Sequence, residues 1–348
     1  MQTVIYKITD LRGADEALDS AAEIIRRGGL VVFPTETVYG LGGDATNPEA
    51  ARKIYAAKGR PSDNPLIIHV AHPSDAEKYT YTNEVYDNLA KYFLPGPLTV
   101  VLPARECIPK ETRAGLDTVA VRCPASDIAR ALIERSGVPI AAPSANLSGS
   151  PSPTTARHAI DDMLGRVDAI IDGPDSDIGV ESTIVSVDRD GSLTLLRPGK
   201  ITVEDLSLVF DEVKIATAVT EGLREGEVAL SPGMKYRHYA PKAEVRLLDG
   251  DISAVCKYLS ELSEKNVAVI AYDEDVKHLK EIISLENIIA FGSRSDELAQ
   301  AKRLFSVLRD LDKRDFSLIL APTPRREGVG LALFNRMIRA AAHKIIKL

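Results

Sequence analysis

Residues 16–33 read EALDSAAEIIRRGGLVVF, a stretch that predicts one helix followed by one strand. Apolar side chains recur with helical spacing from Glu16 to Arg27, and Gly28-Gly29 is a natural helix end. The apolar run Leu30–Phe33 then has the length and composition of a buried strand. A helix followed at once by a buried strand is typical of an α/β fold.

The same alternation continues along the first two thirds of the chain. Asn47-Pro48 has the composition of an N-cap and first-turn proline, so we expect a helix through Ala57. Further strands are expected at residues 66–70, 98–102, 119–122, 140–142, 169–171, 183–187 and 193–196, and helices at 83–93, 127–136 and 155–164. Several strands follow one another without a helix between them, so the sheet should be mixed.

A second domain is expected after a change in composition. Residues 213–243 contain Gly222, Gly226 and the segment SPGMKYRHYAPKA, which together indicate a linker. Strands at residues 245–248, 267–271, 288–291 and 317–321 then alternate with helices at 253–263, 295–311 and 330–346, which predicts a parallel α/β unit. We therefore expect a catalytic domain at 1–212, a linker or lid at 213–243, and a Rossmann-like α/β domain at 244–348.

Size and charge limit the class of protein. The 348 residues exceed one average domain, and 45% hydrophobic residues suffice for a full core. A formal net charge of −7 argues against a protein whose main function is to bind nucleic acid, because such proteins normally have a basic surface. Three cysteines without a CxxC pair indicate neither a disulfide framework nor a zinc site. Without a signal-like N-terminus or an apolar run of about 18 residues, a cytoplasmic protein is expected.

Two glycine-containing segments allow more than one interpretation. Residues 40–45, GLGGDA, fit the dinucleotide-binding pattern, but Pro34–Tyr39 separate them from the strand and no helix opens at once. A glycine-rich turn that lets the backbone approach a ligand is therefore preferred to a nicotinamide site. Lys58-Gly59-Arg60 fits a helix C-cap, which is the preferred interpretation of this segment alone. Its two cations could instead grip phosphates.

Further candidate residues lie where predicted strands end. Residues 142–152, APSANLSGSPS, form a run of small polar residues that could cradle phosphate or simply make a turn before the next helix. Without G-x-S-x-G, Ser144 is a poor candidate nucleophile. Arg122 and Arg197 each end a buried strand, so each needs an anionic partner in the protein or in a ligand. His69 and His72 lack the companion ligands of a metal site.

Taken together, these motifs identify a family. The segments GGLVVFPTETVYGLGGDA, KGRPSDNPLIIHV, PGPLTVVL, TVAVRCP, PIAAPSANLSGSPSPT, GVESTIVSV and SPGMKYRHYAPKA occur in one order. The set resembles the threonylcarbamoyl-adenylate synthase family in its long form, which has a YrdC-like catalytic domain and an added C-terminal domain. The resemblance extends from Gly29 to about Ala243, and beyond that in architecture only. It implies a twisted mixed-sheet α/β catalytic fold.

The resemblance also implies a reaction and a site. Threonine takes up carbon dioxide from bicarbonate as a carbamate, whose oxygen attacks the α-phosphorus of ATP and releases pyrophosphate. The residues implied for ATP are Lys58, Arg60, Ser62, Thr118, Ser144, Asn146, Ser152, Arg197 and Tyr236, with Lys58 and Arg60 as the catalytic pair. Those implied for threonine are Thr35, His69, Arg122, Ala142 through its backbone, and Ser182. No protein metal site is expected, because Mg²⁺ should arrive bound to the ATP phosphates.

The implied partners follow from this chemistry. The adenylate would pass to a tRNA threonylcarbamoyl transferase for threonylcarbamoyladenosine formation, with direct tRNA binding weak or absent and no membrane contact. Three alternatives stay open. The first is a nicotinamide dehydrogenase, which would need residues 40–45 to form a Rossmann turn. The others are an RNA-binding module, which the acidic balance disfavours, and a carbamoyl transferase of hydrogenase maturation. The latter should carry cysteine-rich zinc modules, which three scattered cysteines cannot supply.

Overall fold

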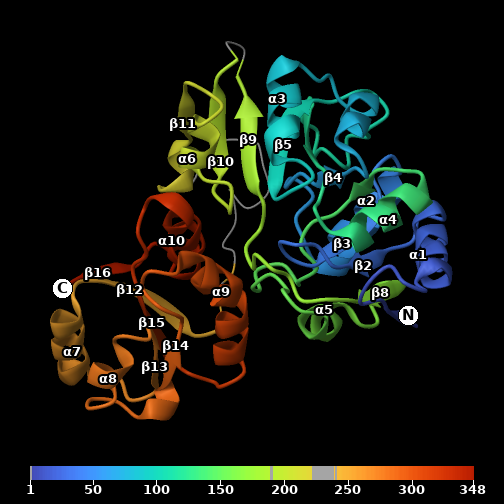
Figure 1. Cartoon of the computed structure of the whole chain (residues 1–348). Coiled ribbons are helices and arrows are strands. Elements are labelled where there is room, and N and C mark those ends of the chain that lie inside the picture. Colours follow the sequence, from blue (N-terminus) through green and yellow to red (C-terminus); the bar gives the residue numbers. More distant parts are fainter. Residues whose placement is uncertain (1, 189–190, 222–238, 240) are drawn as a thin grey trace. The chain divides into compact units, whose positions relative to one another are not determined.

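The computed structural model describes residues 2–188, 191–221, 239 and 241–348. The chain divides into two compact units, Met1–Ser148 with Ser152–Tyr236, and Gly149–Pro151 with Arg237–Leu348. Each unit has a sheet of its own (Figure 1). Within the described residues, no helix is both long and apolar enough to cross a membrane.

The first unit is organised around an eleven-stranded sheet in the order β1-β8-β2-β3-β7-β4-β6-β5-β9-β10-β11. Its strands are β1 (Val4–Lys7), β2 (Val31–Phe33), β3 (Gly40–Asp44), β4 (Ile67–His69), β5 (Leu98–Pro103), β6 (Thr118–Arg122), β7 (Ile140–Ala141), β8 (Ala169–Asp172), β9 (Thr183–Val187), β10 (Leu193–Arg197) and β11 (Val213–Ile215). The sheet contains parallel pairs such as β4–β6 and antiparallel pairs such as β5–β6. The expectation of a mixed sheet is confirmed.

Helices cover both faces of this sheet. On one face, α1 (Asp15–Arg26) and α4 (Asp127–Ser136) pack together and share a core with β2 (Figure 1). On the other face lies α2 (Pro48–Lys58), whose N-cap Asn47 accepts a hydrogen bond from the Glu49 amide as predicted. The other helical segments are η1 (Pro73–Lys78), α3 (Glu84–Phe93), α5 (Ala156–Met163), α6 (Val203–Ser207) and η2 (Thr217–Val219).

The glycines of residues 40–43 lie in strand β3, not in a turn. β3 forms an antiparallel hairpin with β2. A Cβ at Gly42 would lie 2.7 Å from both Ile140 Cγ2 and Phe33 Cε1, and one at Gly43 would lie 3.3 Å from Ala50 Cβ of α2. The interpretation as a ligand-approaching turn is therefore wrong, since these glycines let core side chains and a helix pack closely on the strand. The phosphate turn of a dinucleotide site is also excluded here.

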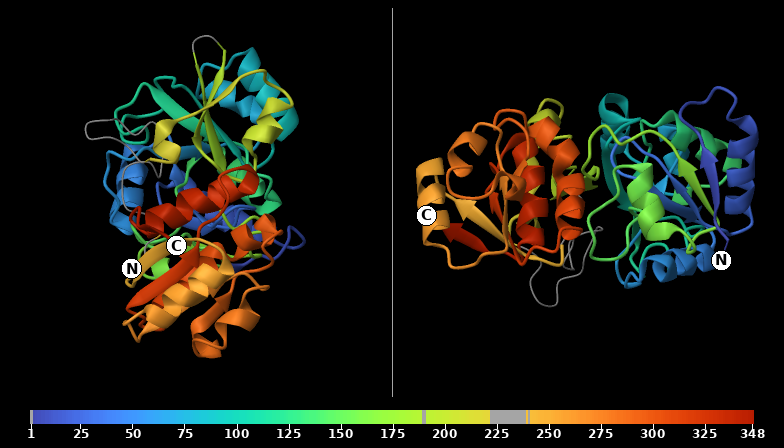
Figure 2. Two further views of the ribbon diagram at one scale, coloured as in Figure 1. Left: turned by 90° about the vertical axis from the view of Figure 1, so that its left-hand side faces the viewer. Right: turned by 90° about the horizontal axis from the view of Figure 1, so that it is seen from below.

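The second unit is a doubly wound parallel sheet in the order β14-β13-β15-β12-β16. Its strands are β12 (Glu244–Asp249), β13 (Val267–Ala271), β14 (Ile288–Ala290), β15 (Leu318–Pro322) and β16 (Ile345–Lys347). Its helical segments are α7 (Ile252–Glu261), α8 (Val276–Leu279), η3 (Leu285–Asn287), α9 (Glu297–Asp312) and α10 (Gly328–Ala340). Helices α7 and α8 lie on one face, and α9 and α10 on the other (Figure 2). This is the Rossmann-like arrangement expected.

The structure departs from the sequence predictions at several short strands. Besides β3, the strands β1, β11 and β16 were not expected, and β11 occupies the beginning of the predicted linker. The helix predicted through residue 346 ends at Ala340, because Ala342 and His343 adopt positive φ values of 47° and 63°. Most of the segment 231–243 lies outside the described residues. Tyr239, which is described, stacks on Phe305 of α9 at 5.0 Å between ring centroids.

Candidate active site

Lys58 ends helix α2 and links two segments that are far apart in the chain. Its side chain is buried, with 3% exposed. Nζ donates to the carbonyl oxygens of Ser144 and Asn146 at 2.5 and 2.6 Å. Gly59, with φ 62°, follows as the left-handed C-cap residue. The C-cap interpretation is thus confirmed for Gly59, while Lys58 itself is directed into the loop predicted to bind phosphate.

The loop after β7 is held by its own side chains and by β3. The Ser144 hydroxyl donates to Oδ1 of Asn146 at 2.5 Å, and the Asn146 amide donates to the Leu147 carbonyl at 2.8 Å. The backbone N–H of Leu41 in β3 donates to the Pro143 carbonyl, and that of Ala145 donates to the carbonyl of Tyr39 just before β3, both at 2.8 Å. Ser144 and Asn146, two of the residues predicted to contact ATP, are therefore in direct contact with each other and with Lys58.

The segment after Lys58 contains a buried amide, Asn64, for which the family resemblance implied no definite contact. Arg60 donates to the carbonyls of Asn64 and Pro65 at 3.1–3.3 Å, while Ser62 lies exposed in the turn between them. Asn64 is 1% exposed, and its Oδ1 and Nδ2 have no hydrogen-bond partner in the described part of the chain. Buried amides are normally satisfied, so Asn64 is a candidate for contact with a ligand. In the sequence, the feature that could have indicated this role is the position of Asn64 within the KGRPSDNP motif.

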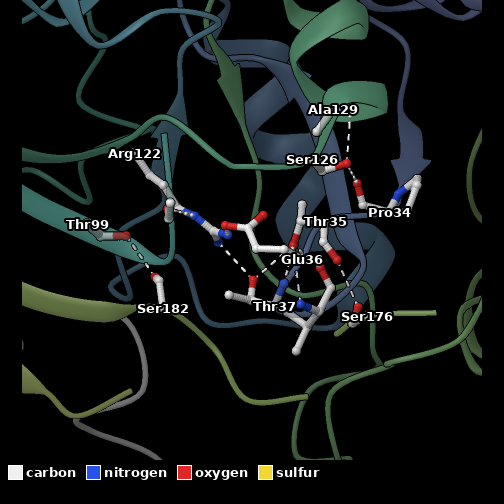
Figure 3. A network of polar contacts seen from close by, with 12 residues as sticks. Pro34, Thr35, Glu36, Thr37, Thr99, Arg122, Ser126, Ala129, Ser176 and Ser182 are labelled. Carbon is white, nitrogen blue, oxygen red and sulfur yellow. Dashed lines mark hydrogen bonds and ion pairs between the residues drawn. The ribbon is translucent and has the colours of Figure 1, made fainter. Parts of the chain in front are cut away.

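Arg122, predicted to hold threonine, is paired with a glutamate of its own chain (Figure 3). Its Nη2 donates to Glu36 Oε1 at 2.6 Å and its Nη1 to Thr37 Oγ1 at 2.9 Å. Thr35 belongs to the same turn, and its hydroxyl donates to the Val38 carbonyl at 2.6 Å. The structure thus brings Thr35 and Arg122 together around the turn between β2 and β3, with Glu36 in direct contact with Arg122.

His69 lies beside Arg122, because β4 and β6 are parallel and these residues are register partners. Burial lowers the pKa of His69 to about 3, and the positive charge of Arg122 contributes to the shift. The imidazole is therefore neutral near neutral pH, and no described group bonds its Nδ1. On the other side of β4, the backbone N–H of Ala142 donates a hydrogen bond to the Ile67 carbonyl oxygen at 2.9 Å.

Ser182 connects the predicted threonine and ATP residues. Its Oγ lies 2.8 Å from Thr99 Oγ1 and accepts a hydrogen bond from Arg197 Nη2 at 3.1 Å. Arg197 Nε also donates to the Ser182 carbonyl at 3.0 Å. An arginine assigned to ATP is therefore bonded to a serine assigned to threonine.

Three of the residues predicted to bind ATP, Ser152, Thr118 and Tyr236, are not in the contacts described above. The Ser152 hydroxyl donates to Glu181 Oε1 at 2.6 Å, so a carboxylate accompanies this position. Thr118 begins β6 and Arg122 ends it, so the two are about 13 Å apart along the strand. Tyr236 lies outside the described residues.

Comparison with known proteins places these observations in a family. A family model described as Telomere recombination matches residues 23–199, and one described as Threonylcarbamoyl-AMP synthase, C-terminal domain, matches residues 201–342. The threonylcarbamoyl-AMP synthase of Pyrococcus abyssi is 44% identical over 337 residues, which cover 94% of each chain. The chain belongs to the threonylcarbamoyl-AMP synthase family. The resemblance inferred from the sequence motifs is confirmed.

Other members and a solved structure extend this result. The threonylcarbamoyl-AMP synthase of Bacillus subtilis is 41% identical, covering 98% of this chain and 97% of its own. The crystal structure of P. abyssi Sua5 complexed with L-threonine has a TM-score of 0.88 and 40% identity, with each chain covered completely. Both units of the fold are therefore those of this family.

The described residues also bear on metal binding. Among them, no three His, Cys, Asp or Glu side chains come together as a metal-binding group. Glu181 places a carboxylate beside one predicted ATP residue, through its hydrogen bond with Ser152. The site is thus built mainly from arginine, lysine, hydroxyl and amide groups.

Proposed function

We propose that the chain is a threonylcarbamoyl-AMP synthase, which makes threonylcarbamoyl-AMP and pyrophosphate from L-threonine, bicarbonate and ATP. The observation that carries the proposal is the match of relatives so named to both units, at 44% identity over 94% of the chain. The geometry supports it, because Lys58 bonds the Ser144–Asn146 loop while Arg122 and Ser182 offer groups for an amino acid. The product serves threonylcarbamoyladenosine formation in tRNA.

The site suits a displacement at phosphorus. The threonine amine takes up carbon dioxide from bicarbonate, and the carbamate oxygen attacks the α-phosphorus while pyrophosphate leaves. Such reactions need positioning and charge neutralisation more than a protein nucleophile. Lys58, Arg60 and Arg197 supply positive charge to the phosphates, and Ser144, Asn146 and Ser152 supply hydrogen bonds. Arg122 suits the threonine carboxylate, because its planar guanidinium can pair with both oxygens.

Mg²⁺ accompanies the nucleotide in this proposal. The ion usually keeps several waters and binds through phosphates and one or two carboxylates. Glu181, which accepts from Ser152, would supply a carboxylate ligand, and phosphate oxygens of ATP would supply others. When bound, Mg²⁺ neutralises charge on the phosphates.

Pyrophosphate release tests the proposed function. Purified full-length protein with ATP, threonine and bicarbonate should release pyrophosphate, and omission of any one substrate should abolish the release. Mass spectrometry should detect threonylcarbamoyl-AMP only in the complete mixture. Pyrophosphate release that does not require threonine would reject the proposal.

The substrate side chain provides a second test. Serine lacks only a methyl group, a difference of about 1–3 kcal/mol, whereas valine leaves hydroxyl partners unpaired, which can discriminate by about 10⁴-fold. We therefore expect serine to be a poor substrate and valine essentially none. Equal use of serine and valine would show that the site does not recognise the hydroxyl.

The onward partner is a tRNA threonylcarbamoyl transferase, which must consume a labile mixed anhydride. Direct tRNA binding by this chain should be weak or absent, because its net charge is −7. A gel shift at physiological salt tests this, and a tight tRNA complex would contradict it.

A further inference from the structure

Glu36 and Arg122 form a buried ion pair with one unused oxygen (Figure 3). The Glu36 side chain is 10% exposed and that of Arg122 is 5% exposed. Arg122 Nη2 donates to Glu36 Oε1 at 2.6 Å, whereas Oε2 of Glu36 is buried and no described group donates to it. A buried carboxylate oxygen without a donor is costly. The structure therefore offers a place for one more hydrogen-bond donor.

Arg122 keeps donors of its own for an anion. Within the described residues it donates to Glu36, to Thr37 Oγ1 at 2.9 Å and, weakly, to the Gly96 carbonyl at 3.4 Å. A guanidinium group carries more N–H donors than these contacts use. The pair can thus donate to an anionic group through Arg122 and accept from a cationic group through Glu36, side by side.

This arrangement matches the two charges of a free amino acid. An α-carboxylate and an α-ammonium group are attached to the same carbon atom, so a carboxylate bound to Arg122 brings the ammonium close to Glu36. The predicted threonine residues other than Arg122 are a threonine, a neutral histidine, a serine and an alanine, none of which supplies negative charge. A buried ammonium group needs such a partner.

We propose that Glu36 binds the ammonium group of threonine through Oε2, while Arg122 binds the carboxylate. This proposal rests on the threonine-binding role of Arg122 in the proposed function. In it, Glu36 recognises the zwitterion and fixes the nitrogen that is to be carboxylated. The competing explanation is that Glu36 only orients Arg122 and never contacts the substrate.

Two ligands separate these explanations. Calorimetry with the full-length protein would measure the affinity for L-threonine and for the 2,3-dihydroxybutanoate of matching configuration, in which a hydroxyl replaces the ammonium group. Glu36→Gln keeps a side-chain oxygen for Arg122 but removes the negative charge. Threonine affinity should then fall about tenfold to a hundredfold, the loss of one charge-assisted contact. Affinity for the dihydroxy acid should stay the same or rise. Asp127→Asn, an exposed carboxylate of α4, is the matched control and should change neither affinity.

Each outcome decides between the explanations. An equal loss for both ligands would assign Glu36 to orienting Arg122 only, and unchanged threonine binding in Glu36→Gln would exclude any role. If Glu36→Gln does not fold, the wild-type protein still tests the proposal, because it should bind the dihydroxy acid at least tenfold more weakly than threonine. Equal wild-type affinities would overturn it. A wild-type protein that binds neither ligand would instead count against the proposed function.

Discussion

Lys58 and Asn146 are 88 positions apart in the chain, yet Lys58 Nζ donates to the Asn146 carbonyl oxygen at 2.6 Å and lies 3.3 Å from its Oδ1. One cation therefore holds the loop that is predicted to surround the phosphates. This contact gives Lys58 a structural role beside its proposed catalytic one, and the two roles can be separated by experiment.

Lys58→Ala should lower both activity and stability. A charge-assisted contact contributes about 1.5–3 kcal/mol, so pyrophosphate release should fall roughly tenfold to a hundredfold or more. The melting temperature should fall too, because buried carbonyls lose their donor. Lys53→Ala is the control, since Lys53 lies on the same helix and also donates to a carbonyl, that of Gly28 at 2.6 Å. A Lys58→Ala protein with wild-type turnover would refute the catalytic role.

Asn64→Leu should separate binding from folding. Because neither polar atom of this buried side chain has a described partner, an apolar side chain of similar shape should leave the melting temperature unchanged or raise it. If the amide contacts the nucleotide, the KM for ATP should rise about tenfold. A variant that loses stability and keeps its KM would show that Asn64 is structural.

Ser182→Ala should affect both substrates at once. Its hydroxyl accepts from Arg197 and contacts Thr99, so its loss should shift a predicted ATP residue as well as the threonine site. Steady-state kinetics should show higher KM values for ATP and for threonine. Ser186→Ala, in the strand β9 that follows Ser182, should change neither. An effect on threonine alone would mean that the link to Arg197 has no functional consequence.

His69 should make stability depend on pH in the acidic range. Its folded-state pKa is about 3, below the value of about 6.5 in an unfolded chain. Between pH 6.5 and pH 3, His69 is protonated in the unfolded state but neutral in the folded state. The free energy of unfolding therefore decreases as the pH falls, by at most about 1.4 kcal/mol per pH unit. Denaturant titrations should show a shallower loss of stability in His69→Gln, with the exposed His72→Gln as control. Identical pH profiles for His69→Gln and wild type would contradict this assignment.

Gly42→Ala should destabilise the first unit. The added Cβ would lie 2.7 Å from Phe33 Cε1 and Ile140 Cγ2, and such overpacking costs about 1–3 kcal/mol. Gly43→Ala should cost less, because its nearest contacts are 3.1–3.3 Å. Chemical denaturation of both variants measures the difference. A Gly42→Ala protein as stable as wild type would mean that these neighbours can move aside.

The fold could be predicted where the local pattern decides the structure. Residues 127–136 and 183–187 match their predictions at both ends, because Ser126 caps the helix, Gly137 ends it, and Ile184 and Val185 form a buried apolar pair in the strand. The strands β1 and β11 could not be recognised, since they are only four and three residues long and most of their side chains are exposed. The glycines of β3 were wrongly interpreted as a turn. They are needed because Phe33, Ile140 and helix α2 pack closely against the strand, which the local sequence does not show.

The site could be predicted only where motifs and family resemblance coincide. Lys58 and Asn146 belong to such motifs, and the structure places them in contact. Glu36 and Asn64 also lie in motifs of the family, PTET and KGRPSDNP, but the neighbouring residues do not show that these two side chains are buried. Glu36 meets Arg122 across 86 positions, a pairing that only the folded sheet creates. The structure therefore points to candidate residues that chain order does not single out.

The eleven-stranded sheet has β1 at one margin and β11 at the other, so its outermost strands are also the first and last in the sequence. A fragment that ends at residue 199, where the first family match ends, would lose β11 and leave the backbone groups of Leu193–Leu195 without their neighbour. Unpaired strand margins recruit other chains. Such a fragment should self-associate in light scattering, whereas one that ends at residue 221 should remain monodisperse.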